Sequence, residues 1–436
     1  MLKTYRLPYN DSYIELKIPE ENVLHYLALR TDNSNEDNIE QLHQAMARAR
    51  GVPLHFLVDK KKVGLIIEDA TRAVPLDELL QVLFPHLSGA GAICVLLATG
   101  THDGENEENY KIINKVKHYA NHFSIPIKEI INHNCHAHEF YSAGITQGIK
   151  NEVFVNARVK DIQVFVTLSD MKNHYFAGYS NALKNFLPGI CKYETIERNH
   201  ALTLKEGATF GRHPLHPDPS RRTNPLSQDI WEGYQLIVGG RPVYVLATIT
   251  KQDQILWAGA GTLEDVISEG IKKVDEMMSV VVTPSDKMIV SCGGYPGDES
   301  LYTAQRALEL TKNGIKDAGE IIFLAGCVNG IGHQKSIGNF YEPLKKDISD
   351  ILSSYQERYI MYSHKTYKFA QLIQKMNKIH MLSRLPAYYV ADIHLNPITD
   401  AQSVVDGWLK ENPDTVINIF SEGNKLAVHA APHPPG

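Results

Sequence analysis

Short apolar runs alternate with amphipathic stretches along most of the chain. Val63–Ile67, Ile93–Ala98 and Ile162–Leu168 are apolar runs of strand length, and polar or glycine-rich residues follow each of them. Helical spacing of apolar residues marks the stretch 107–120 that lies between two of these runs. Buried strands that alternate with helices indicate a mostly parallel sheet with helices on both faces.

The same alternation resumes after Thr283-Pro284-Ser285, a candidate domain boundary. Strands are predicted over Lys287–Ser291 and Glu320–Cys327, each with a glycine-rich end. The prediction is therefore an α/β protein with a first domain over 1–280, which carries the candidate site residues, and a doubly wound second domain over 281–436. An active site is expected in the cleft between them.

Composition excludes several classes of protein. The 436 residues carry a net charge of −6, and no basic stripe suggests nucleic acid. No apolar run is long enough to span a membrane, and the amino terminus lacks the apolar core of a signal peptide. Five scattered cysteines without a Cys-x-x-Cys pattern indicate no disulfide framework and a reducing, cytoplasmic location.

Polar side chains follow the first two predicted strands. Asp69, Thr71 and Arg72 come directly after one strand, and His102 lies in the loop after the next. Ligands of open α/β sheets bind at such carboxyl ends. Arg72 can hold a carboxylate through two parallel hydrogen bonds, although a surface ion pair between Asp69 and Arg72 and an inert loop histidine remain the alternatives.

The stretch from His174 to Ile190 holds an imidazole and a lysine between turn-forming residues. Ser180 is the predicted N-cap of a short helix that carries Lys184 and ends at Pro188-Gly189. The alternative is a solvated helix lysine beside a loop histidine. A helical run over 193–200 ends at His200, which is expected to return to the same pocket.

A histidine cluster over His133–His138 offers a different chemistry. His-x-His on a strand places both rings on one face, as in some zinc sites. A metallohydrolase that uses this cluster is therefore one competing hypothesis, although no further ligand occurs at a regular spacing.

Taken together, these residues resemble the lactate racemase family, the nickel-pincer 2-hydroxyacid racemases and epimerases. The matching pieces occur in the family's order: Asp69-Ala70-Thr71-Arg72, Gly100-Thr101-His102, His174 with Gly178, Ser180, Lys184 and Pro188-Gly189, His200, Asn224-Pro225, Gly293-Gly294-Tyr295-Pro296-x-Asp298, Tyr302 and His364-Lys365.

The resemblance implies a cofactor, a pyridinium mononucleotide with thioamide and thiocarboxylate arms that hold nickel. It implies covalent attachment at Lys184 and a nickel ligand at His200, a donor type that nickel accepts. Separate biosynthetic proteins would supply the cofactor. Further residues are implied at the cofactor: Asp69, Thr71, Ser180 and Tyr302.

The resemblance also implies the roles of the residues that face the substrate. His102 and His174 would act as acid and base on opposite faces, and Arg72 would orient the carboxylate. Inversion of a 2-hydroxy acid by deprotonation at carbon is difficult because the carboxylate is already negative. Transfer of hydride to a cofactor gives a planar 2-keto acid instead, and needs one base for each face.

Two departures from the family pattern affect these expectations. Asn181-Ala182 replaces two glycines before the lysine. Thr303 and Arg306, expected to bind substrate, replace a glutamine and a lysine. The expected substrate is therefore a 2-hydroxy acid other than lactate. A carrier that binds a nucleotide or a small acid without catalysis is the remaining alternative.

Overall fold

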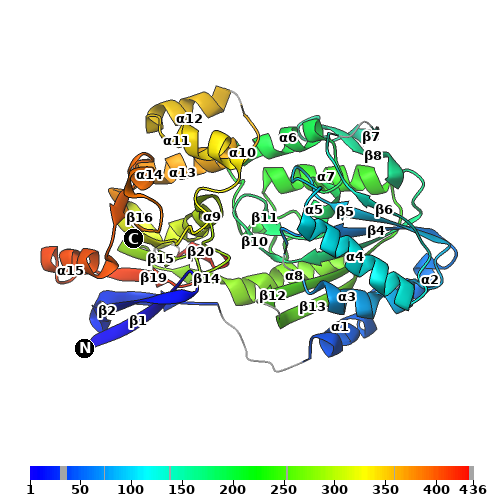
Figure 1. Cartoon of the computed structure of the whole chain (residues 1–436), viewed down its shortest axis with the longest axis horizontal. Coiled ribbons are helices and arrows are strands. Elements are labelled where there is room, and N and C mark those ends of the chain that lie inside the picture. Colours follow the sequence, from blue (N-terminus) through cyan, green and yellow to red (C-terminus); the bar gives the residue numbers. More distant parts are fainter. Residues whose placement is uncertain (30–36, 73, 137–138, 252–253, 358, 432–436) are drawn as a thin grey trace. The chain divides into compact units, whose positions relative to one another are not determined.

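The computed structural model describes residues 1–29, 37–72, 74–136, 139–251, 254–357 and 359–431 (Figure 1). The chain divides into two compact units. Unit 1 comprises Met1–Arg30 and Met277–Gly436, and unit 2 comprises Thr31–Glu276. Mixed α/β content with mostly parallel sheets confirms the predicted fold class. The first residues of the domain predicted over 1–280 are instead part of unit 1.

Unit 2 is built on a six-stranded sheet in the order β13-β12-β9-β4-β5-β6. Its strands are β4 (Lys62–Glu68), β5 (Ala92–Ala98), β6 (Ile127–Asn132), β9 (Val164–Asp170), β12 (Val243–Lys251) and β13 (Gln254–Thr262). All neighbouring strands run parallel except β12 and β13, which pair antiparallel. The strand ends predicted to carry polar residues therefore meet at one edge.

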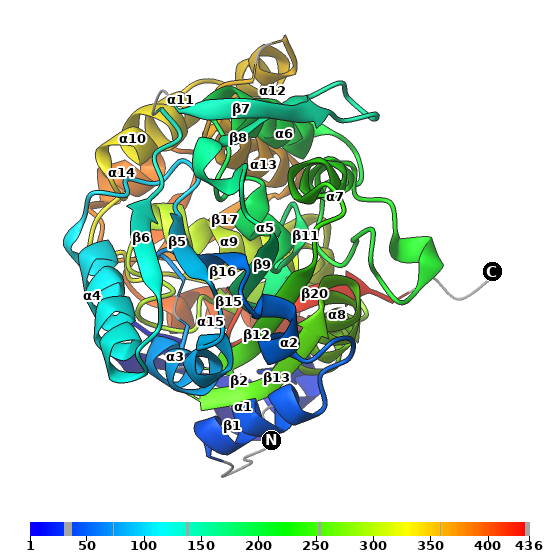
Figure 2. The ribbon, with the colours of Figure 1, turned by 90° about the vertical axis from the view of Figure 1, so that its right-hand side faces the viewer.

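Helices and two short hairpins complete unit 2. The helices are α1 (Asn38–Ala47), α2 (Leu54–Val58), α3 (Leu76–Leu83), α4 (Glu107–His122), α5 (Leu183–Phe186), α6 (Tyr193–Ala201), α7 (Pro225–Val238) and α8 (Leu263–Met278). The hairpins are β7 (Phe140–Ile145) with β8 (Glu152–Asn156), and β10 (Lys172–His174) with β11 (Gly178–Ser180). The segment before α7 stands out from the unit in Figure 2.

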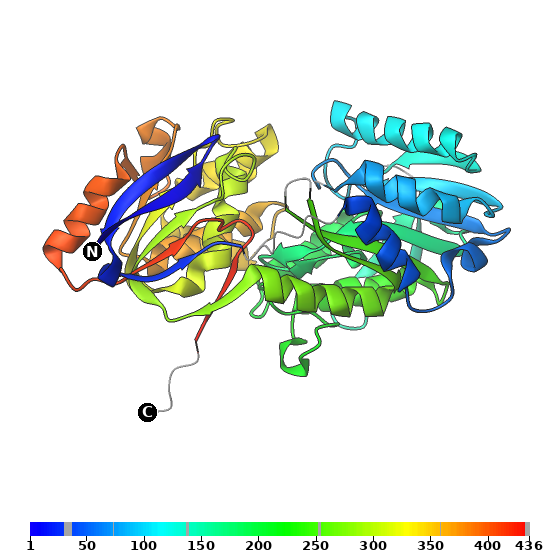
Figure 3. The same ribbon diagram turned by 90° about the horizontal axis from the view of Figure 1, so that it is seen from below.

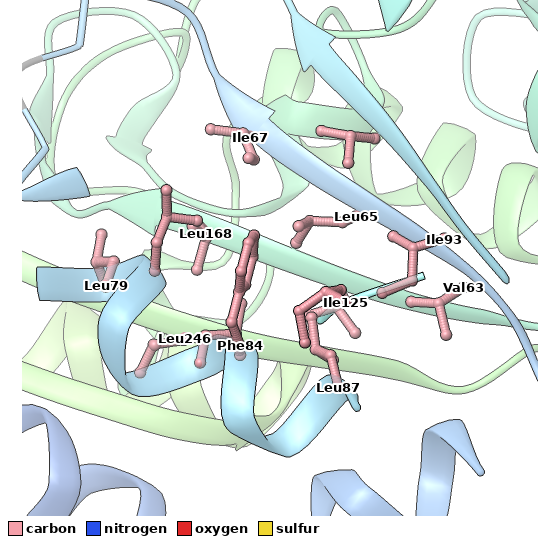
Figure 4. Packing of buried hydrophobic residues seen from close by; sticks show 14 of the residues in the cluster. Val63, Leu65, Ile67, Leu79, Phe84, Leu87, Ile93, Ile125, Leu168 and Leu246 are labelled. Carbon is pink, nitrogen blue, oxygen red and sulfur yellow. The ribbon is translucent and has the colours of Figure 1, made fainter. Parts of the chain in front are cut away.

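Alternate residues of the central strands form the core of unit 2. Val63, Leu65 and Ile67 of β4 point to the face that α1, α3 and α4 cover, and all three are fully buried. Phe84, just after α3, lies among strand side chains in Figure 4. The opposite face is covered by α5 and α7. The ring centroid of Phe186 on α5 lies 5.5 Å from that of Phe165 on β9 and 5.1 Å from that of Tyr234 on α7.

Unit 1 contains a second six-stranded sheet, in the order β18-β17-β16-β15-β19-β3, with every pair parallel. Its strands are β3 (Val23–Leu27), β15 (Ser285–Ser291), β16 (Ile315–Leu324), β17 (Lys378–Leu382), β18 (Asn396–Ile398) and β19 (Ile417–Phe420). Its helices are α9 (Leu301–Thr311), α10 (Gln334–Ser336), α11 (Glu342–Leu344), α12 (Ile348–Glu357), α13 (Ser363–Lys375), α14 (Ala387–Ala391) and α15 (Ala401–Glu411).

Strand pairing and apolar burial explain why the amino terminus belongs to unit 1. β3 pairs with β19 as an edge strand, and the hairpin of β1 (Leu2–Tyr9) and β2 (Ser12–Pro19) packs on the sheet beside α15 (Figure 3). Leu7, Leu16 and Ile18 of this hairpin are fully buried with Trp408 of α15. A two-stranded sheet of β14 (Ser279–Val282) and β20 (Ala427–Ala430) joins the same unit.

Membrane insertion was not expected from the sequence. Across the parts of the chain that the structure describes, no helix combines the length and the apolar character that a bilayer crossing requires.

Candidate functional site

Asp69 and His102 form a hydrogen-bonded pair at the carboxyl edge of the sheet in unit 2. Glu68 pairs with Ala98 at the ends of the parallel strands β4 and β5, so the residues that follow both strands are neighbours. Nδ1 of His102 lies 2.7 Å from Oδ2 of Asp69. The carboxylate is buried, whereas the imidazole side chain is 42% exposed.

This contact sets the proton positions on His102. The buried carboxylate accepts a hydrogen bond from the Nδ1–H of His102. A neutral ring therefore carries its lone pair on Nε2. Burial alone would raise the pKa of Asp69, but the hydrogen bond and charge of His102, a hydrogen bond from Thr71 and the charge of Arg72 hold it below its usual value. Asp69 therefore stays ionised, and His102 is oriented as a proton acceptor.

Thr71 and Arg72 lie in the turn that Asp69 begins. The Thr71 hydroxyl donates to Oδ1 of Asp69 at 2.6 Å, and the backbone N–H of Arg72 donates to the Asp69 carbonyl at 3.0 Å. No surface ion pair between Asp69 and Arg72 occurs in the described structure. The turn thus leaves the half-buried guanidinium of Arg72 available for an anionic ligand.

His174 and Lys184 meet across the short hairpin that follows β9. His174 ends β10, and Lys184 lies in α5. Nζ of Lys184 is 2.7 Å from Nε2 of His174, whose side chain is largely buried. Nδ1 of the same ring accepts a hydrogen bond from the backbone N–H of Ala177. Both nitrogens of His174 are therefore engaged.

The helix that carries Lys184 begins differently from the prediction. Ser180 was predicted as its N-cap, but Ser180 ends β11, and the helix starts only at Leu183. Its N-cap is Ala182, which makes no side-chain capping bond, and Oδ1 of the preceding Asn181 accepts the backbone N–H of Leu183 at 3.0 Å. The prediction was wrong because a three-residue hairpin leaves no periodic pattern in the sequence.

Asn181 lies at a position where the resemblance implies a glycine. Its side chain is buried, and its amide nitrogen lies 3.1 Å from Nε2 of His213. The amide therefore links the turn before Lys184 to the segment around His213. The larger residue is accommodated by this contact within the turn.

His200 lies in the last turn of α6, within the same part of unit 2. Its Nδ1 donates to the carbonyl of Ile196 at 3.1 Å, which places the lone pair of a neutral ring on Nε2. Burial is the largest cause that lowers the pKa of His200 to about 3. A neutral imidazole with one nitrogen fixed by a carbonyl is the form that binds metal ions.

A backbone hydrogen bond and ring contacts join the loop that carries His102 to the segment 174–189 and to His200. The N–H of Gly100 donates to the carbonyl of Gly189 at 3.0 Å, and a Cβ added at Gly100 would lie 3.6 Å from Pro188. The Phe176 ring contacts both His174 and His200, at centroid distances of 4.3 and 5.8 Å. The structure thus gathers the candidate residues of unit 2 at one place.

The remaining candidates lie in unit 1, on the first turns of α9. Nε and Nη2 of Arg306 donate to the carbonyl of Asn424, and the Thr303 hydroxyl contacts Ser300, whose side chain caps the helix. The amine of Lys365 lies 3.7 Å from the ring centroid of Tyr302. Thr303 and Arg306 therefore take part in local contacts in this unit.

The His133–His138 cluster does not form a metal site where it is described. His133 is buried, its Nε2 lies 3.0 Å from the Cys191 carbonyl, and its Nδ1 accepts from Asn156. Burial lowers the pKa of His133 to about 4. His136 is exposed, and His138 lies outside the described residues. Among the described residues no group of three His, Cys, Asp or Glu could hold a metal ion.

Glu68, which sequence reasoning passed over, is a buried carboxyl beside the Asp69 turn. Burial raises its pKa to about 7; Asp170 adds to the rise, while Arg72 and Lys172 oppose it. Its oxygens accept from the Ser169 hydroxyl and the Asp170 N–H, both at 3.2 Å. The sequence signal for this buried carboxyl was a glutamate directly after the apolar run 63–67.

A stability measurement can test the protonation of Glu68. The folded pKa lies above the ordinary value of 4.5, so the free energy of unfolding should fall as pH rises from about 4.5 to about 7. The loss attributable to this group is about 3 kcal/mol. In Glu68→Gln this part of the slope should vanish, as measured by urea unfolding at several pH values. An unchanged slope would contradict the assignment.

Comparisons with known proteins match two parts of the chain to two domains of one family. Residues 9–211 match the model of the lactate racemase N-terminal domain, and residues 280–425 match that of the C-terminal domain. Lactate racemase from Thermoanaerobacterium thermosaccharolyticum is 24% identical over 97% of this chain and 98% of its own length. Lactate racemase from Lactiplantibacillus plantarum is 24% identical over 79% of this chain and 78% of its own.

Solved structures share the fold. The lactate racemase apoprotein from T. thermosaccharolyticum superposes with a TM-score of 0.84 and 22% identity, over 98% of this chain and all of the other. A protein from Thermotoga maritima gives a TM-score of 0.60 at 13% identity, over 93% of this chain and all of the other. Together, the two domain models span most of the sequence in the expected order, and the chain belongs to the lactate racemase family.

Proposed function

We propose that the protein is an isomerase, a racemase or epimerase that inverts the C2 centre of a 2-hydroxy acid through a 2-keto acid. Membership of the lactate racemase family supports the reaction class. The observation that carries the proposal is the Asp69–His102 pair, located in the same part of unit 2 as His174, Lys184 and His200.

The residues present fit the cofactor that the family implies. Lys184 would hold it covalently, and His200 would bind its nickel through Nε2, because Nδ1 is committed to the Ile196 carbonyl. The bound group supplies a reversible acceptor for hydride, which no side chain can provide.

Proton transfer falls to the two histidines. Nε2 of His102 would take the hydroxyl proton of one enantiomer, while Asp69 stabilises the imidazolium that forms. His174 would serve the opposite enantiomer, and each ring returns its proton when the product forms. Arg72 would hold the substrate carboxylate through paired hydrogen bonds, which fixes C2 relative to both rings.

The substrate is proposed to differ from lactate. The family's glutamine and lysine on the helix of unit 1 are replaced by Thr303 and Arg306, which changes the hydrogen-bonding groups and the shape of the cation. A longer hydroxy acid or a sugar acid would suit a site with a guanidinium in place of an ammonium.

Coexpression with the cofactor biosynthetic proteins and nickel tests the proposal. The purified protein should carry nickel and a mass increase that maps to Lys184. It should then abolish the optical activity of one member of a panel of single-enantiomer 2-hydroxy acids. A protein that carries the adduct and nickel, yet inverts no hydroxy acid in the panel, would reject the proposed reaction and favour the carrier hypothesis.

A further inference from the structure

The contact between His174 and Lys184 contains information about proton positions. Nδ1 of His174 accepts the N–H of Ala177 at 3.2 Å, so Nδ1 carries a lone pair and no proton. A neutral imidazole must then carry its single proton on Nε2. That nitrogen lies 2.7 Å from Nζ of Lys184, a hydrogen-bonding distance.

Only one form of the lysine satisfies this arrangement. An ammonium group has three donors and no acceptor, so it would place N–H against N–H at 2.7 Å. The lone pair of an uncharged amine can instead accept a hydrogen bond from the Nε2–H of His174. The Phe176 ring, 5.7 Å from Nζ, would favour the charged form, but at this distance by less than about 1 kcal/mol. The hydrogen-bond geometry therefore selects the uncharged amine.

We propose that His174 holds Lys184 as an uncharged nucleophile in the apoprotein, a role that precedes and is distinct from proton transfer to substrate. Its target would be the thiocarboxyl carbon of a pyridinium mononucleotide, and this identity rests on the proposed function. The amine lone pair forms the C–N bond, the C–O bond breaks, and the sulfur remains as a thioamide. The oxygen leaves as water with one amine proton and one solvent proton, so no oxidant or reductant is needed.

The surrounding structure positions both His174 and the part-buried Lys184. His174 is 9% exposed and stacks on Tyr175 at a centroid distance of 5.4 Å, which fixes the plane of its ring. Lys184 lies in the first turn of α5, where the backbone N–H of the neighbouring Leu183 donates to Oδ1 of Asn181. The amine and the imidazole are therefore placed by backbone elements rather than by flexible loops, so the pair exists before any ligand binds.

Chemical labelling of the apoprotein tests the proposal without cofactor or activity. Pyridoxal 5′-phosphate forms an imine with an uncharged amine, borohydride fixes the product, and peptide mass spectrometry gives the rate at each lysine. At about pH 7, Lys184 should react about tenfold or more faster than the exposed Lys150. His174→Gln places a carbonyl oxygen near the amine, which favours the ammonium, and should slow Lys184 by about tenfold while Lys150 is unchanged.

Controls separate this proposal from a folding defect and from the proposed function. His136→Gln makes the same chemical change at an exposed site of unit 2 and should leave both rates unchanged. Nitrogen NMR of the wild-type protein should show His174 protonated at Nε2 and not at Nδ1, a result independent of any variant. Equal rates at Lys184 and Lys150, or a proton on Nδ1, would overturn the proposal. A reactive Lys184 in a protein that inverts no hydroxy acid would reject only the proposed function.

Discussion

Lys184→Arg is expected to remove both the covalent adduct and the isomerase activity. Arginine keeps a positive charge and a long side chain, but the guanidinium is protonated throughout the accessible pH range and is a poor nucleophile. Without the adduct no group can accept hydride, so activity should fall below detection rather than to a reduced rate. Intact mass, nickel content and optical rotation of the coexpressed protein provide the measurement.

Lys192→Arg is a suitable control for this variant. Lys192 lies in the same unit, next to α6, and forms a partly exposed ion pair with Glu194 at 3.3 Å. The same substitution there should leave adduct, nickel and activity intact, because exposed ion pairs contribute little. An adduct that persists in Lys184→Arg, at another lysine or by another linkage, would contradict the attachment site.

The sheet of unit 2 and part of the site follow from local patterns in the sequence. The apolar runs 63–67 and 93–98 have the length and the punctuation of buried parallel strands. Once two such strands are placed side by side, Asp69 and His102 must be neighbours, since both follow strand ends at one sheet edge. Their pairing was therefore available from the sequence, although the roles assigned to them separately did not use it.

Other features depend on contacts that one sequence does not reveal. β10 and β11 have three residues each, too few for a period of two, so the hairpin that brings His174 to Lys184 has no pattern. The contact of Asn181 with His213 spans 32 residues of irregular chain. The pairing of β3 with β19 joins residues about 390 positions apart, and no local pattern in the sequence indicates it.

Asp69→Asn is expected to lower the rate of inversion by about 10²- to 10⁴-fold while the adduct at Lys184 and the nickel content stay at wild-type levels. Asparagine keeps the size of the side chain but removes the negative charge that stabilises an imidazolium, and its amide can turn a donor toward Nδ1. The first change destabilises the protonated ring, and the second places the ring proton on Nε2, so each weakens His102 as a base. His102→Asn, which removes the base itself, should cost at least as much.

The two substitutions together distinguish a positioning role for Asp69 from a separate role at the cofactor. Asp69 and Thr71 were first assigned to cofactor binding, whereas the structure directs the Asp69 carboxylate at His102. If Asp69 acts only through the imidazole, Asp69→Asn should have no further effect on the rate in a His102→Asn background. Asp103→Asn on the same loop is the matched control, because within the described residues this exposed carboxylate accepts a backbone N–H from Glu105 and makes no contact with the His102 ring. Additive losses in the double variant, or reduced nickel in Asp69→Asn alone, would indicate that Asp69 has a separate role in cofactor binding.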